Sequence, residues 1–182
     1  MDFMELVKKR QSVREYSGKP VPREIIEYCL EAARLAPSAC NSQPWTFVVV
    51  DGQKAKRRFV DRVFSGEYSA NDFAKKAAVI IVVVSEQSDF ISAVGRYFKD
   101  ARDYLIDIGI ACEHLVLAAT EKGLGVCWIG WFDQKSAKEI LEIPEDKKID
   151  VMISLGYPKD DTAMEKTRKK IDKIRKFDKY GA

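Results

Sequence analysis

The sequence predicts an α+β fold, a layered domain in which helices flank a central mixed β-sheet and one long helix is buried. Two observations lead to this prediction. Six consecutive β-branched residues at 79–84 are typical of a central strand that is covered on both faces. The stretch 96–122 has room for one long helix ending at Gly123, and its middle is apolar nearly all round. We therefore expect a single core with few strands and several helices.

The N-terminal third contains two further helices. Residues 2–10 have helical spacing of apolar side chains, with Asp2 as the N-cap. A polar segment, 11–21, separates this helix from a second one that begins at Pro22. The second helix ends before Pro37, because a proline pushes the residue before it out of the α region.

The remaining elements follow from β-branched runs, turn residues and helical spacing. They are strands at 45–50, 126–129 and 149–155, helices at 53–64 and 135–141, and a turn at Asp51-Gly52.

Length and composition limit the classes of protein. The 182 residues are close to one domain by size, so we expect a single domain over 1–182 with a basic C-terminal arm over 159–182. The net charge of +3, from 31 basic and 28 acidic residues, is too balanced for general nucleic-acid binding. The charged N-terminus is unlike a signal peptide and the apolar stretch is interrupted by charges, so we expect a cytoplasmic protein without a membrane span. Four cysteines without paired spacing and a single histidine argue against a zinc site: Cys29, Cys40, Cys112 and Cys127.

The first chemical motif is Arg10-Gln11-Ser12-Val13-Arg14. Two guanidinium groups beside a hydroxyl, just past a helix, suit an anion, because the arginine fork matches the geometry of phosphate. Taken alone, the motif is also typical of two solvated surface arginines.

The second motif is the loop 36–45, in which two prolines stiffen a segment carrying Ser38, Asn41 and Gln43. Amide side chains offer a donor and an acceptor together, which suits the edge of a flat heterocycle such as flavin. A well-capped connection into a buried strand would have the same sequence.

The third motif is Gly123 to Phe132. Its glycines run from helix into strand, the reverse of a dinucleotide-binding loop, so Gly123 is better explained as a helix C-cap. Gly130, between Trp128 and Trp131, would allow the backbone to approach a planar ligand. We expect at least one of these tryptophans to lie in the core.

Together these motifs resemble the nitroreductase family over nearly the whole chain. The resemblance rests on the R-x-S-x-R box, the P-S-x-x-N-x-Q-P-W loop, the apolar central helix, the G-L-G strand and the closing Leu155-Gly156-Tyr157-Pro158. It implies an intertwined homodimer with FMN at the subunit interface and NAD(P)H as co-substrate. Reduction of nitroaromatics, quinones or similar acceptors would follow a ping-pong scheme, in which flavin N5 carries the hydride.

The resemblance also implies the cofactor-binding residues. Arg10 and Ser12 would hold the phosphate, and Arg14 would reach the pyrimidine edge of the ring and tune it, so no protein residue is expected to be catalytic. The partner subunit would supply its loop, and backbone at the end of a strand would lie beside the ring. The further residues implied are Pro37, Ser38, Ala39, Asn41, Gln43, Ile129, Gly130, Lys166, Arg168 and Lys169, with Lys169 as a replacement for Lys166 at the phosphate.

Some positions receive no cofactor role. The segment 65–76 aligns poorly with the family, so Asn71 and Lys75 are assigned none. Cys40 is interpreted as a passive small side chain and His114 as a packed core residue. Two alternative functions stay open: a dimer that only stores or carries FMN, and the same scaffold with another flavin reaction such as reductive dehalogenation.

Overall fold

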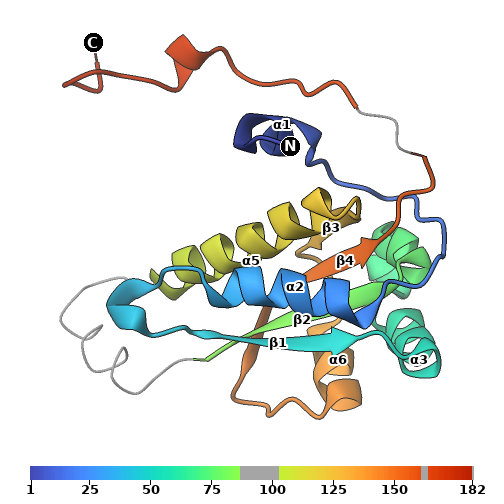
Figure 1. The fold of residues 1–182 in the computed structure, drawn as a ribbon. Coiled ribbons are helices and arrows are strands. Elements are labelled where there is room, and N and C mark those ends of the chain that lie inside the picture. The colour runs from blue at the N-terminus through green and yellow to red at the C-terminus, as the bar shows by residue number, and fades with distance from the viewer. Residues whose placement is uncertain (87–102, 161–163, 182) are drawn as a thin grey trace.

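The computed structural model describes residues 1–86, 103–160 and 164–181 (Figure 1). One sheet has the strand order β1-β2-β4-β3. Its strands are β1 (Trp45–Val50), β2 (Val79–Ser85), β3 (Gly125–Ile129) and β4 (Lys148–Gly156). The α-helices are α1 (Phe3–Lys9), α2 (Arg23–Arg34), α3 (Gln53–Val63), α5 (Asp103–Glu121) and α6 (Gln134–Leu141), with 3-10 turns η1 (Ala39–Asn41), η2 (Gly66–Lys76) and η3 (Ile171–Lys173).

The expected mixed sheet needs a correction. All neighbouring strands pair antiparallel, and the parallel pairing within the described residues is an isolated bridge between Ser12 and Val126. The prediction failed because a run of β-branched residues reports coverage of both faces of a strand and not the direction of its neighbours. That coverage is present, since every residue of β2 is buried.

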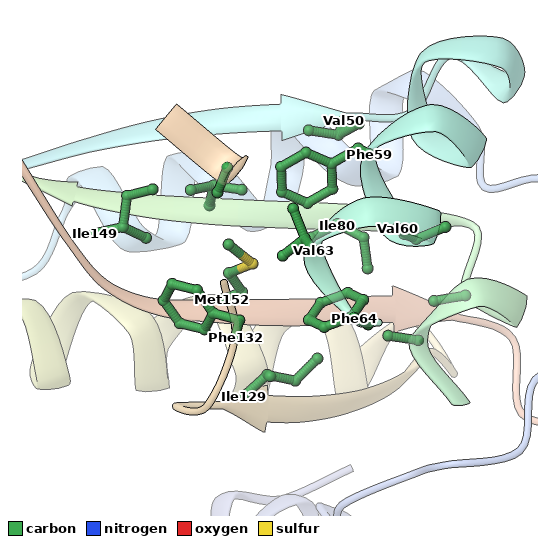
Figure 2. Packing of buried hydrophobic residues seen from close by; sticks show 14 of the residues in the cluster. Val50, Phe59, Val60, Val63, Phe64, Ile80, Ile129, Phe132, Ile149 and Met152 are labelled. Atoms are coloured by element: carbon green, nitrogen blue, oxygen red, sulfur yellow. The ribbon is translucent and has the colours of Figure 1, made fainter. Parts of the chain in front are cut away.

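The core lies on both faces of the sheet. On one face α3, η2 and α6 contribute a cluster in which Phe59 and Phe64 pack over Ile80 and Met152 (Figure 2). On the other face α2 and α5 lie against the sheet (Figure 1), and the middle of α5 is buried as predicted.

The local signals at helix ends are confirmed. Asp2 caps α1 in a capping box with Glu5, and α2 follows Pro22. Helix α5 ends at Glu121, and Gly123 has the positive φ of +76° that a C-capping glycine supplies. Residues 96–102 of the predicted long helix lie outside the described residues.

Two terminal regions leave apolar side chains uncovered. Helix α1 has no buried residue, and Phe3 is 66% exposed. The segment from 164 onward extends away from the sheet (Figure 1), with Phe177 69% exposed. Among the described helices, none combines the length and the apolar character that a bilayer crossing requires.

Candidate functional site

The segment after α1 lies along the free edge of β3. The Val13 amide donates to the Val126 carbonyl at 2.8 Å, and Ser12 bridges Val126 in parallel. Gly125 makes this approach possible: a Cβ atom there would lie 2.7 Å from the Val13 Cβ. A side chain at position 125 would therefore push the segment off the strand.

The arginine-serine-arginine motif gathers around one residue of β3. Burial raises the pKa of the Cys127 thiol, whereas Arg14, the Ser12 hydroxyl and Arg10 lower it. All three motif side chains are therefore close enough to influence this sulfur atom. Since alternate residues of an extended segment point to the same side, Val13 packs on the core while its neighbours face outward.

Tyr16 anchors the far end of this segment. It is 4% exposed, and its hydroxyl lies 2.8 Å from Ser154 Oγ on β4, so burial raises the pKa of Tyr16. The Ser17 amide donates to the Tyr157 carbonyl at 2.9 Å. The segment 10–17 is thus tied to the sheet on both sides of Arg14.

A cation cluster joins the two ends of the chain. The pKa of Lys166 is lowered by burial first, and then by Arg10 and Arg168. The Lys166 ammonium also donates to the Val7 carbonyl at 2.8 Å. Lys169 lies exposed on the arm, and no described contact ties it to the cluster.

The charges of this cluster suit an anion. Among the described residues, no carboxylate lies within 4.0 Å of a charged nitrogen of Arg10, Lys166 or Arg168. Glu113 on α5 is near enough for Arg10 to lower its pKa, although burial raises that pKa more strongly. Three cations held together without a paired acid are an arrangement that a phosphate would stabilise.

Arg14 lies between two cavities. One, of about 340 Å³, lies along residues 11–15, and the other, of about 680 Å³, separates the same segment from η2. The Arg14 guanidinium lies 5.8 Å from the centroid of the Phe73 ring. This cation therefore lines both cavities.

The end of β3 is open at Gly130. Ile129 is 2% exposed, whereas Gly130 is exposed and a Cβ there would meet nothing within 4 Å. Trp131 is 55% exposed, so of the two flanking tryptophans only Trp128 packs against the core. The backbone at Gly130 is therefore open to solvent, and its contact with a flat ligand stays a prediction.

Segment η2, to which the sequence gave no role, touches this site twice. The side-chain amide of Asn71 donates to the Trp131 backbone carbonyl at 2.7 Å, and the Phe73 ring lies beneath the Arg14 guanidinium. Lys75 is paired with Asp72 at 2.8 Å. No local pattern in 65–76 indicates these contacts, because each joins η2 to a segment distant in the sequence.

The loop between α2 and β1 is held in a strained conformation. Cys40, Asn41 and Gln43 have positive φ values of 52°, 53° and 47°. Such values are unfavourable for residues other than glycine. The Ser38 hydroxyl accepts a hydrogen bond from the backbone amide of Gln43 at 2.9 Å.

A buried acid supports the same loop. Asp107 on α5 is 6% exposed, and both of its carboxylate oxygens lie 3.2 Å from the Ala39 amide nitrogen. Pro37, Ala39, Cys40 and the two amide residues remain exposed. A rigid, solvent-facing loop of this kind is suited to contact a ligand or a second chain.

The structure does not bring this loop to the cation cluster within one chain. The loop lies at the start of α5 and the segment 10–17 at its end (Figure 1). None of the described contacts joins this loop to Arg10, Lys166 or Arg168, whereas Asp107 near the start of α5 holds it. The predicted site residues therefore form two groups, one around Arg14 and Gly130 and the other around Ser38.

Two residues without a predicted ligand role have simple environments. Cys40 is an exposed free thiol. His114 is half-buried, and its Nδ1 lies 3.1 Å from the Ala32 carbonyl, so it joins α5 to α2. In the described part of the chain, no three His, Cys, Asp or Glu side chains are grouped as metal ligands.

Comparison with known proteins identifies relatives over the whole fold. The family model described as "Nitroreductase family" matches residues 7–157. A protein of Archaeoglobus fulgidus described as "Putative NADH dehydrogenase/NAD(P)H nitroreductase" is 33% identical, covering 88% of this chain and 87% of its own. An "Iodotyrosine deiodinase" of Thermotoga neapolitana is 28% identical, covering 86% and 90%.

Solved structures with a similar fold are also found. A nitroreductase family protein from Clostridium novyi NT has a TM-score of 0.76 at 32% identity, covering 91% of this chain and 89% of its own. A structure described as an oxidoreductase containing FMN has a TM-score of 0.69 at 26% identity, covering 88% and 78%.

Proposed function

The chain belongs to the nitroreductase family, and from this membership we propose that it is an FMN-dependent oxidoreductase. It passes hydride from NAD(P)H to nitroaromatics, quinones or similar electron-poor acceptors. The observation that supports this most directly is the cation cluster of Arg10, Lys166 and Arg168, which lacks a paired carboxylate among the described residues. Its charge and its two-ended origin fit the phosphate of FMN.

The residues near Arg14 would hold the ring. Arg14 carries a permanent positive charge and lines both cavities, so it would favour a ring that gains negative charge on reduction. Ser12 adds a hydroxyl donor beside the phosphate-binding cations. The open backbone at Gly130 lets an N–H group reach the ring edge, while buried Ile129 keeps the strand end in place. When bound, FMN supplies hydride chemistry at N5, which no side chain of the protein provides.

A second copy of the chain completes the site in this proposal. Asp107 holds the loop with Pro37, Ser38, Ala39, Asn41 and Gln43 near the start of α5, and no described contact joins this loop to the cations of its own chain. The partner's loop would therefore face the ring. Exposed apolar side chains on α1 and on the arm give such a dimer surface to bury.

The test is a visible spectrum, followed by anaerobic addition of NADH or NADPH to the purified protein. We expect an oxidised-flavin band near ~450 nm that bleaches with one of the nucleotides, and an elution volume of a dimer in gel filtration. Arg168→Ala should weaken FMN retention, and Arg175→Ala, whose side chain pairs with Asp172 on the same arm, is the matched control. A colourless monomer that does not take up FMN would contradict the proposal, and a yellow protein inert to both nucleotides would indicate an FMN carrier.

A second candidate reaction is reductive dehalogenation. It is favoured by the similarity to a protein described as an iodotyrosine deiodinase, over 86% of this chain. Release of iodide from an iodotyrosine by the reduced protein, faster than reduction of a nitroaromatic, would support it.

A further inference from the structure

A large exposed aromatic side chain, that of Trp131, follows Gly130 directly. Trp131 is 55% exposed, although the residues on either side of Gly130-Trp131, Ile129 and Phe132, are 2% and 9% exposed. An exposed indole next to two buried neighbours does not contribute to the core. Exposed aromatic surface is unfavourable in water, so a ligand that covers it gains from burial.

The indole is also held in position. The Tyr68 ring meets the Trp131 ring edge to face, with centroids 5.7 Å apart and planes inclined by 69°. The Trp131 carbonyl accepts from the Asn71 amide at 2.7 Å. Both contacts come from η2, so one segment fixes the ring and its backbone. A ligand would not have to order this side chain on binding.

The same segment links Trp131 to the cation that would face the flavin. Phe73 of η2 lies 5.8 Å from the Arg14 guanidinium, and Asn71, two residues before it, contacts Trp131. Phe73 lines the space of about 680 Å³ between η2 and residues 14–17, while Asn71 of the same segment holds Trp131 directly after Gly130. A molecule reacting beside Gly130 would meet an aromatic surface on this side.

We propose that Trp131 is a specificity-determining residue that stacks on a planar, electron-poor aromatic acceptor. This inference rests on the proposed function and specifies its substrate class. Indole is electron-rich, and an electron-poor ring has the complementary charge distribution for offset stacking. Acceptors without an aromatic ring gain nothing from this contact.

The experiment compares binding and turnover in the FMN-loaded protein. Oxidised protein is titrated, without nicotinamide nucleotide, with 4-nitrobenzoate and with cyclohexanecarboxylate, which has the same carboxylate but no aromatic ring. Turnover per bound flavin is measured with 4-nitrobenzoate and with ferricyanide. The variants are Trp131→Leu, which keeps apolar bulk, and Trp131→Phe, which keeps a ring, with Tyr28→Leu on α2 as the control for loss of an exposed aromatic.

We expect Trp131→Leu to weaken 4-nitrobenzoate binding, and to lower its kcat/KM, by about five- to tenfold. Cyclohexanecarboxylate binding and ferricyanide reduction should change less than about twofold, and Trp131→Phe should recover most of the loss. Equal losses with all ligands, or no loss with 4-nitrobenzoate, would overturn the role of Trp131 alone. Flavin in the unmodified protein that neither nucleotide reduces would instead refute the proposed function, and the inference with it.

Discussion

The two halves of the candidate site are held in different ways. The segment 10–17 follows the edge of β3, and its backbone and Tyr16 bond to the sheet. Among the described strand pairings none involves the loop 36–44, and three of its residues have left-handed backbone conformations. Regular pairing with the sheet holds the first half. The second half has a strained backbone, which prolines and buried Asp107 keep in place.

This difference indicates what each half tolerates. A paired segment depends on close approach, so it should fail when atoms are added beneath it. A strained loop depends on the groups that hold it. Removing those groups should therefore lower the stability of the protein, and relieving the backbone strain should raise it. Four substitutions, in order of decreasing expected effect, test this contrast.

Gly125→Ala should cause the largest loss, because the new Cβ would lie within 2.8 Å of three Val13 atoms. We expect unfolding free energy to fall by about 3 kcal/mol and FMN retention to be lost as the segment moves off β3. Denaturant unfolding and flavin content per chain measure both effects. Gly52→Ala, where the nearest atom is 3.8 Å away, is the control, and similar behaviour of the two variants would contradict close packing.

Asp107→Ala should act on the other half. It leaves the Ala39 amide without its partner, and we expect a loss of about 2 kcal/mol together with weaker FMN binding. Asp107→Asn keeps an acceptor oxygen and should lose less in a thermal unfolding comparison. If the two variants lost equally, the negative charge and not the hydrogen bond would hold the loop.

Cys40→Gly should have the opposite sign. At a φ of 52° glycine relieves backbone strain, which outweighs the greater freedom of the unfolded chain, so we expect a gain of about 0.5 kcal/mol. Ala39→Gly, at a neighbouring position without positive φ, should lose about as much. Equal losses in melting experiments would mean that the loop is not strained at Cys40.

Glu113→Gln should have the smallest effect on stability; this residue lies near Arg10. Burial raises the pKa of Glu113, so the folded protein keeps this proton to higher pH than the unfolded chain. The contribution of Glu113 to stability is therefore present below the unfolded pKa, about 4.3, and is lost as the pH rises through the folded pKa. The variant should match the original protein in acid and be more stable above this window in thermal melts. Arg10→Ala should enlarge the difference, since Arg10 opposes the shift.

Much of the fold was predictable because its signals are local. The β-branched run of β2, Pro22 before α2 and Gly123 after α5 each act within a few residues, and each prediction is confirmed. Strand direction was not predictable in this way, because it depends on which segments meet across the sheet.

The grouping of Arg10, Ser12 and Arg14 on one side of their segment was predictable, because these residues alternate along it, while their role toward a cofactor stays a prediction. The contacts of Asn71 and Asp107 were missed, because each joins segments at least 60 residues apart and leaves no periodic pattern. Which of Trp128 and Trp131 enters the core was also open, since both flank one glycine and only the course of the chain after β3 separates them.

The pairing of residues 12–13 with Val126 also has a consequence for solubility. Strand β3 is the last of the sheet, and an uncovered last strand offers unsatisfied amides and carbonyls to other molecules. The short parallel bridge occupies part of this boundary. Substitutions in the arginine motif that detach the segment from β3 should therefore promote aggregation as well as the loss of the proposed flavin.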